Sequence, residues 1–110
     1  DDLKFAHHDG GTVVTIEGPR FSTKAESMLF RSWGCDVINM STVPEICLAR
    51  ELKLEYQSIA MSTDYDCWHK SEAEVTMEMI FAVMEKNVHN VKKLIEHVIP
   101  LIKKEYELGK

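Results

Sequence analysis

The chain carries, at residues 37–49, the stretch VINMSTVPEICLA, in which a short apolar run gives way to polar residues and then to helical spacing. Residues 37–40 are too few for a helix and predict a strand. Thr42, with Glu45 three positions later, forms a capping-box signature, which predicts that a helix begins at this point. A strand followed directly by a helix is typical of α/β proteins.

The same alternation continues on both sides of this stretch. The β-branched run at residues 12–17 predicts a strand, and the mostly apolar residues 54–62 predict a strand covered on both faces. Between them, Thr23 and Glu26 form a second capping box, before a helix that Gly34 ends. The predicted order is strand, helix, strand, helix, strand. Because such a sheet has open edges and too few helices to cover it, we expect it to pack onto further protein.

A long helix is predicted from residue 76 onward, because apolar residues recur there at steps of three and four. They are Met77, Ile80, Phe81, Met84, Val88, Val91, Ile95, Val98 and Ile102. Pro100 is expected to kink or end this helix. A helix of about thirty residues extends about 45 Å, whereas a compact body of about 100 residues has a radius of gyration near 13 Å. The helix therefore also points to missing protein, and we interpret residues 1–110 as a single segment of a larger domain.

The composition excludes several classes of protein. The chain has 110 residues, 45% of them hydrophobic and 28% charged, which is typical of a globular protein. Its net charge of −5, without a dense Lys/Arg cluster, argues against nucleic-acid binding. No apolar run approaches the roughly 18 residues of a membrane span, and the start lacks signal-peptide features, so we expect no membrane association.

The cysteines and histidines favour a reducing compartment and no metal site. Three cysteines without a C-x-x-C spacing predict a cytoplasmic protein, with the nucleus left open as a second location. We expect Cys35, Cys47 and Cys67 to act as small buried hydrophobes. His7 and His8 are adjacent, so on a strand they would point to opposite faces, which is poor geometry for one metal ion.

Polar residues follow two of the predicted strands, at the usual position of ligand sites in open α/β sheets. Residues 39–42 precede a helix N-terminus, where backbone N–H groups attract anions such as phosphate; the alternative is that Thr42 only caps the helix. Residues 63–68 contain Asp64 and Asp66, two carboxylates that would be unfavourable to bury without a function. The alternative for this second segment is a solvated acidic loop.

Several consecutive motifs resemble the methylthioadenosine phosphorylases, the members of the trimeric purine nucleoside phosphorylase family that cleave 6-aminopurines. The motifs are TIEGPRFS at 15–22, AES at 25–27, WGCDVINM at 33–40, VPE at 43–45, SIAM at 58–61 and TDYDCW at 63–68. They cover nearly the whole chain in the family's order. Because family members are much longer, the chain resembles only their C-terminal portion.

The resemblance implies an α/β fold, a three-layer sandwich around a mixed central sheet, to which this chain contributes the C-terminal part with a long terminal helix. It implies phosphorolysis of 5′-methylthioadenosine to adenine and 5-methylthioribose 1-phosphate, a step of purine and methionine salvage, by a homotrimer. Inorganic phosphate is then the co-substrate, and neither a metal nor an organic cofactor is expected.

Carried over by position, the resemblance assigns the base-binding role to four residues, with Asp64 as the catalytic one. They are Phe21, Thr63, Asp64 and Asp66. Cleavage of an N-glycosidic bond builds negative charge on the departing purine, so a proton shared at N7 lowers the barrier. Burial against Phe21, beside Asp66, would favour the neutral carboxyl group that this step needs.

The remaining roles concern the sugar and phosphate. The resemblance places Met40 against the ribose and Ser41 on phosphate, where the family usually has threonine. It also places Met77, Ile80 and Phe81 in the wall of the methylthio pocket, with bulkier side chains than the family's valine and leucine. The alternative for these three is that they only pack the helix onto the sheet.

Two other functions stay open at this point. One is a purine nucleoside phosphorylase that acts on adenosine or inosine. An aspartate at position 64 argues against inosine, because a carboxylate accepts a hydrogen bond from a 6-amino group whereas a 6-oxo group needs a donor such as Asn. The other is a non-catalytic, truncated interaction module.

Overall fold

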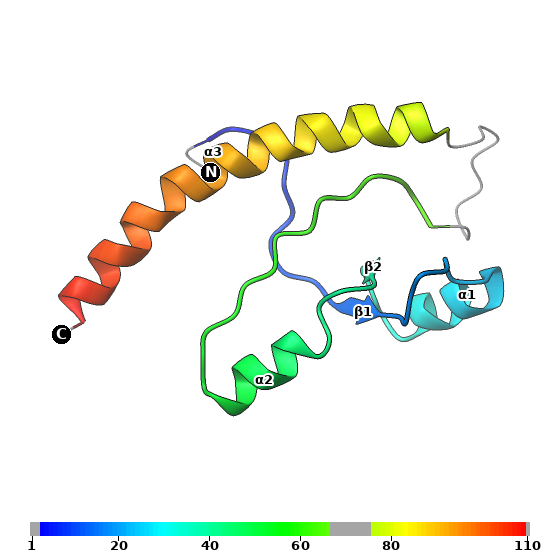
Figure 1. Ribbon diagram of the computed structural model, residues 1–110, viewed down its shortest axis with the longest axis horizontal. Helices are drawn as coiled ribbons and strands as arrows, with labels where there is room; N and C mark the ends of the chain where they lie inside the picture. Colours follow the sequence, from blue (N-terminus) through cyan, green and yellow to red (C-terminus); the bar gives the residue numbers. More distant parts are fainter. Residues whose placement is uncertain (1–2, 67–75, 110) are drawn as a thin grey trace. The chain divides into compact units, whose positions relative to one another are not determined.

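The computed structural model describes residues 3–66 and 76–109. These residues belong to two compact units, a sheet unit (Asp9–Glu74) and a helix unit (Asp1–His8 with Val75–Lys110). The elements found in the described residues follow the order shown in Figure 1: β1 (Val13–Thr15), α1 (Lys24–Ser32), β2 (Val37–Asn39), α2 (Glu45–Glu51) and α3 (Met77–Leu108). The predicted α/β class with a long terminal helix is confirmed.

The sheet unit is built on a parallel pair of strands. The register places Val13 opposite Val37, Val14 opposite Ile38 and Thr15 opposite Asn39. Parallel neighbours require a crossover, which α1 supplies. Two of the three predicted strands are therefore confirmed, each shorter than its apolar run.

The third predicted strand, at residues 54–62, is wrong for the described chain, where this segment takes no regular structure. Leu54 is 60% exposed and Ile59 45% exposed, so the segment is not covered on both faces. A strand forms only where a neighbour accepts its backbone hydrogen bonds. The burial predicted from the apolar composition is therefore also wrong for this segment, because the described residues supply neither the neighbouring strand nor the covering layer.

The N-terminus of α1 forms as predicted. The Thr23 hydroxyl accepts a hydrogen bond from the Glu26 N–H at 3.2 Å, and Glu26 Oε1 accepts one from the Thr23 N–H at 3.0 Å. Both arms of the capping box are thus present. At the other end Gly34 has a φ of +78°, the left-handed conformation that glycine adopts without a steric penalty after a helix.

The predicted capping box of α2 is wrong. This helix begins at Glu45 with Pro44 in the N-cap position, and no side chain caps it. The Thr42 hydroxyl instead accepts a hydrogen bond from Asn39 Nδ2, so the alternative that Thr42 serves only as a cap is also wrong. Asn39, at the end of β2, thus binds the Thr42 hydroxyl that the sequence pattern assigned to the helix N-terminus.

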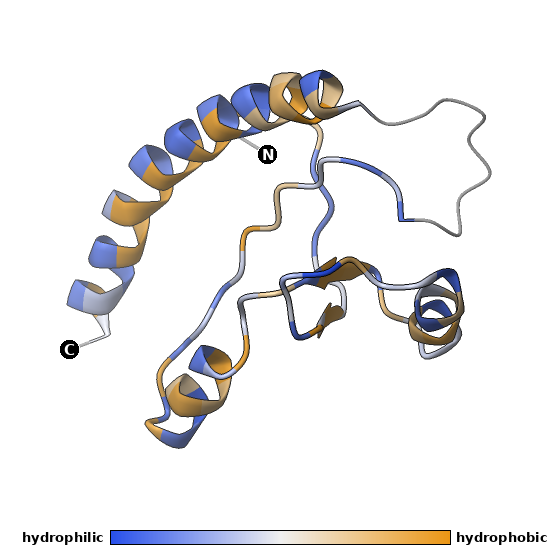
Figure 2. Ribbon diagram, turned by 45° about the vertical axis from the view of Figure 1, so that its right-hand side comes forward, coloured by the Kyte–Doolittle hydropathy of each residue, from blue (hydrophilic) through white to orange (hydrophobic). Residues whose placement is uncertain are grey.

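The helix unit consists mainly of α3, whose 32 residues extend about 48 Å. Thr76 caps it by accepting a hydrogen bond from the Met79 N–H at 3.3 Å. Pro100 lies inside the helix and does not end it; the ribbon curves through this region in Figure 1. Figure 2 shows apolar residues along the inner side of the curve over the C-terminal half. No helix within residues 3–66 and 76–109 has the length and apolar content that a membrane crossing requires.

The described residues of neither unit form a hydrophobic core. Among the described residues no hydrophobic side chain is buried, and the buried residue is Ser27, at 1% exposure. Cys35 is half-buried and Cys47 is exposed, so the prediction of a buried thiol is wrong for Cys47, while Cys67 lies outside the described residues. Domains of this size normally bury more than half of their surface. Within each unit, the described residues therefore leave the apolar faces of these elements uncovered.

Candidate functional site

Three polar side chains link the carboxyl ends of the two strands. Thr15 Oγ1 donates a hydrogen bond to Asn39 Oδ1 at 2.8 Å, and lies 3.4 Å from Thr42 Oγ1. Asn39 Nδ2 in turn donates to Thr42 Oγ1. All three contacts are partly buried, which strengthens them relative to contacts in water. This strand-end cluster (Thr15, Asn39, Thr42) holds the turn at residues 40–41 against the ends of β1 and β2.

The turn at residues 40–41 contacts the loop at residues 18–23. A Cβ atom placed on Gly18 would lie 3.0 Å from Met40 Sδ and 3.5 Å from Met40 Cβ. Met40 thus packs closely over Gly18, where a larger residue would displace its side chain. The Ser41 side chain is exposed. The structure therefore brings together the predicted ribose and phosphate residues and the loop that carries Phe21.

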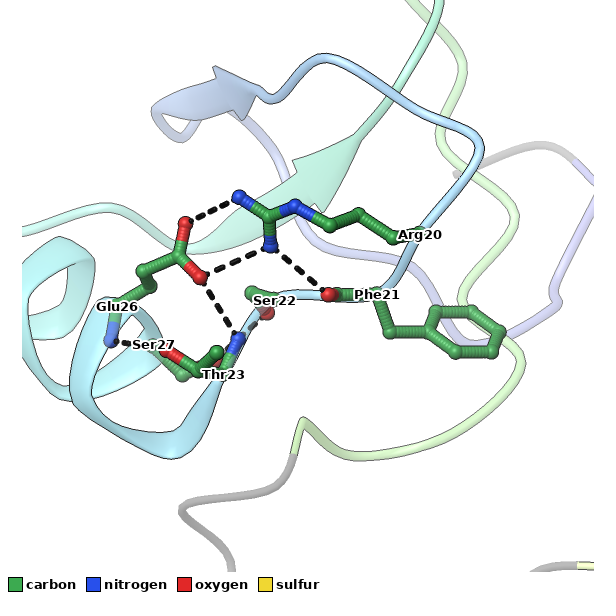
Figure 3. Close-up of polar contacts among 6 residues, drawn as sticks. All are labelled: Arg20, Phe21, Ser22, Thr23, Glu26 and Ser27. Carbon is green, nitrogen blue, oxygen red and sulfur yellow. Dashed lines mark hydrogen bonds and ion pairs between the residues drawn. The ribbon is translucent and has the colours of Figure 1, made fainter.

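The loop at residues 18–23 is held by an ion pair that the sequence analysis did not identify. Arg20 Nη1 and Nη2 donate to Glu26 Oε1 at 2.9 Å and Glu26 Oε2 at 2.8 Å, and Nη1 also donates to the Phe21 carbonyl at 3.1 Å (Figure 3). The Phe21 ring points away from these contacts and is 88% exposed. The available signal was an arginine six positions before the glutamate of a capping box.

This ion pair changes the acid–base behaviour of both partners. The hydrogen bond from Arg20, together with that from the Thr23 backbone N–H, lowers the pKa of Glu26 from its ordinary 4.5 to about 2. The hydrogen bond to Glu26 and its negative charge raise the pKa of Arg20. The pair consequently stays charged throughout the physiological pH range.

Acidification is expected to weaken the loop through Glu26. Because the pKa of this carboxylate is lower in the folded protein than in the unfolded chain, its contribution to stability is complete above about pH 4.5 and is lost as the pH falls towards 2. Carbon-13 NMR of the side-chain carboxyl groups would measure the pH midpoint of the Glu26 titration. A Glu26 midpoint that stays near the ordinary 4.5 would contradict the predicted effect of Arg20.

The acidic segment contributes a second set of polar groups to the sheet unit. Thr63 Oγ1 donates a hydrogen bond to Asp64 Oδ1 at 2.7 Å. Asp64 is exposed. Asp66 is half-buried and lines a small hollow together with Ser27 and Asp36. Since Phe21 is exposed as well, the described residues do not bury Asp64 against it. The base-binding roles stay predictions, because the described residues do not supply the shielding that these roles need.

The three residues predicted for the methylthio pocket belong to the first turns of α3, in the helix unit. Met77, Ile80 and Phe81 are spaced so that they share one face of the helix. Met77 is 60% exposed and Phe81 65% exposed, so this face is available to a ligand or to packing. Their role also stays a prediction. Cys67 and Trp68, at the end of the acidic segment, lie outside the described residues.

Comparison with known proteins identifies the family of the chain. Residues 2–100 match the Phosphorylase superfamily. The S-methyl-5′-thioadenosine phosphorylases of Anopheles gambiae and Aedes aegypti are 55% and 57% identical to it over 95 residues, which are 86% of this chain and 34% of each relative. That of Aspergillus fumigatus is 55% identical over 92 residues, 84% of this chain and 27% of the relative. The chain thus spans about a third or less of the length of these relatives.

Solved structures give the same result for the fold. A double mutant of adenosine/methylthioadenosine phosphorylase from Schistosoma mansoni, in complex with adenine, is 44% identical with a TM-score of 0.77, over 87% of this chain and 34% of that chain. A methylthioadenosine phosphorylase from an antarctic soil metagenomic library is 41% identical with a TM-score of 0.79, over 87% and 33% of the two chains. The resemblance drawn from the motifs is confirmed.

Proposed function

The chain belongs to the phosphorylase superfamily, and from this premise we propose that it supplies the base-binding part of an enzyme that cleaves 5′-methylthioadenosine with inorganic phosphate. The contact between Gly18 and Met40 is the observation that carries the proposal. It joins the loop of the base-binding Phe21 to the turn of Met40 and Ser41, so that base, ribose and phosphate can be bound side by side.

In the proposed reaction, phosphate attacks C1′ of the ribose while the bond from C1′ to the purine nitrogen breaks. The electron pair of that bond passes into the purine ring, and Asp64 shares its proton with N7. Thr63 donates to Asp64 Oδ1, which leaves Oδ2 for the purine. General acid catalysis of this kind contributes about 10²–10⁴-fold to a rate.

Two features favour the 6-amino and 5′-methylthio groups of the substrate. Asp64 and Asp66 provide acceptors for an exocyclic amino group. Met77, Ile80 and Phe81 provide apolar surface for the thioether, where each buried methylene contributes about 0.8 kcal/mol. A 5′-hydroxyl group would gain nothing there and would lose its hydrogen bonds to water.

We further propose a homotrimeric enzyme without metal or organic cofactor, active in purine and methionine salvage in the cytoplasm, with the nucleus as a second location. The absence of dense basic clusters in the sequence supports small-molecule partners rather than nucleic acid. Adenosine is the second candidate substrate, because the Schistosoma mansoni relative is named for both adenosine and methylthioadenosine.

The test uses a chimaera, called here the completed enzyme, in which this chain is joined to the part of the Anopheles gambiae relative outside the matched 95 residues. Adenine released from methylthioadenosine is measured with and without phosphate. We expect adenine and 5-methylthioribose 1-phosphate in equal amounts, and only when phosphate is present. Release without phosphate would indicate a hydrolase. A folded, adenine-binding but inactive chimaera would indicate a non-catalytic module.

Loss of the strand-end cluster is expected to weaken phosphate binding. Thr15→Val removes the donor to Asn39 Oδ1 and leaves a partly buried acceptor unpaired, which costs about 1–3 kcal/mol. Because the turn that carries Ser41 is then less firmly held, the KM for phosphate should rise in the completed enzyme. Thr12→Val, at an exposed position of the same segment, is the matched control. An equal KM for phosphate in both variants would contradict this role of the cluster.

A further inference from the structure

The backbone around Phe21 is anchored while the Phe21 ring is free. Arg20 Nη1 donates to the Phe21 carbonyl at 3.1 Å, and on the other side the Thr23 N–H donates to Glu26 Oε1 at 3.0 Å. Between these points the Ser22 and Ser27 hydroxyl groups share a hydrogen bond of 2.8 Å, and Ser27 is buried. Every residue from 20 to 23 is therefore held by a hydrogen bond, yet the ring at position 21 projects away from these contacts (Figure 3).

We propose that Arg20 is a positioning residue: its guanidinium group sets the backbone at position 21 so that the aromatic ring is already oriented for the purine. The proposal rests on the proposed function, in which Phe21 binds the base. Arg20 does not itself touch the substrate. Its side chain connects the Phe21 carbonyl to Glu26, and Glu26 belongs to the first turn of α1, so the loop takes its orientation from the helix.

The shape of the guanidinium group explains why an arginine occupies this position. One nitrogen, Nη1, is shared between Glu26 Oε1 and the Phe21 carbonyl, while Nη2 binds Glu26 Oε2. This arrangement needs at least two donor nitrogens held in one plane, which arginine has and lysine lacks. Lysine would keep the charge but could not hold the carboxylate and the carbonyl in the same fixed geometry.

Stability alone does not account for this arrangement. The side chains of Arg20 and Glu26 are 58% and 32% exposed, and exposed ion pairs contribute little to folding. The bidentate geometry instead fixes the direction of the Arg20 guanidinium group relative to Glu26. A ring that is 88% exposed has few contacts of its own to orient it, so the backbone must do so. Pre-orienting a binding group raises affinity because less conformational entropy is lost on binding.

The test measures adenine binding by calorimetry, and the nucleoside and phosphate KM values, in the completed enzyme. If binding must order the backbone of one residue, Arg20→Gln should weaken adenine binding about 5–30-fold. Arg20→Lys should not restore it. The nucleoside KM should rise in parallel, while kcat and the phosphate KM stay within about twofold. Lys103→Gln, which breaks the exposed contact with Glu107, should change none of these values.

A double-mutant cycle separates positioning from a merely structural role. Phe21→Ala removes the ring that Arg20 is proposed to orient, so adding Arg20→Gln to it should weaken adenine binding no further. Additive effects would overturn the inference, as would an Arg20→Gln variant that binds adenine as tightly as wild type. A wild-type completed enzyme that binds no adenine would overturn the proposed function, and this inference with it.

Discussion

Asp64→Asn is expected to slow the phosphorolysis of methylthioadenosine by the completed enzyme about 10²–10⁴-fold. An amide cannot supply the proton that the departing purine shares at N7. It also presents an N–H donor where the 6-amino group needs an acceptor, so adenine-type substrates are left with an unpaired polar group. Hypoxanthine nucleosides, whose 6-oxo group accepts such a bond, should lose less activity or gain it.

The measurement compares kcat/KM for methylthioadenosine and for inosine in wild type and variant. The selectivity for the 6-amino substrate should fall by several orders of magnitude, because unpaired polar groups discriminate at the level of about 10⁴-fold. Glu107→Gln, which neutralises an exposed carboxylate of α3, serves as the control and should have no effect. Unchanged selectivity in Asp64→Asn would remove Asp64 from its proposed role, and the structural likeness of the chain to phosphorylases would remain.

The 110 residues alone are expected to show neither cooperative unfolding nor phosphorolysis. No hydrophobic side chain is buried among the described residues, and Trp33 and Leu52 are 66% and 71% exposed. Hydrophobic burial is the main favourable contribution to folding, so without it the loss of chain entropy is not offset. The 32-residue α3 exceeds the roughly 12–15 residues below which an isolated helix is marginal, and should stay partly helical.

Circular dichroism and scanning calorimetry would check this second prediction. The isolated chain should lose its helical signal gradually on heating, without a heat-absorption peak. The completed enzyme should give a sharp transition and release adenine. A cooperative transition in the isolated chain, or adenine release by it, would show that these residues bury their apolar faces among themselves.

Local sequence patterns predicted the elements whose partners are close in the chain. The capping box of α1 depends on Thr23 and Glu26, three residues apart, and formed as predicted. The apolar stripe of α3 likewise lies within one helix. Residues 54–62 failed as a strand because a strand needs a neighbour, which no local pattern specifies. The capping box at Thr42 is an exception, because it is equally local and did not form: the Thr42 hydroxyl accepts a hydrogen bond from Asn39 at the end of β2 instead.

The motifs predicted which residues belong to the candidate site, but they did not predict the contacts that hold these residues in place. The resemblance assigned site roles to Phe21, Met40 and Ser41, which stay predictions, but it did not show what holds these residues in place. The contacts that do so join distant positions: Thr15 to Asn39 across the two strands, and Gly18 to Met40 between loop and turn. Such contacts depend on the parallel register, which becomes visible only once the strands are paired.

In the proposed reaction, the carboxyl group at position 64 shares a hydrogen with the purine as it leaves. The most direct measurement is the distance from the nearer Asp64 carboxylate oxygen to purine N7 in a crystal structure of the completed enzyme with adenine and phosphate. We predict a hydrogen-bond distance of about 2.6–3.2 Å, with the carboxyl group covered by protein. An Asp64 side chain directed into bulk water, with adenine bound elsewhere, would contradict the account.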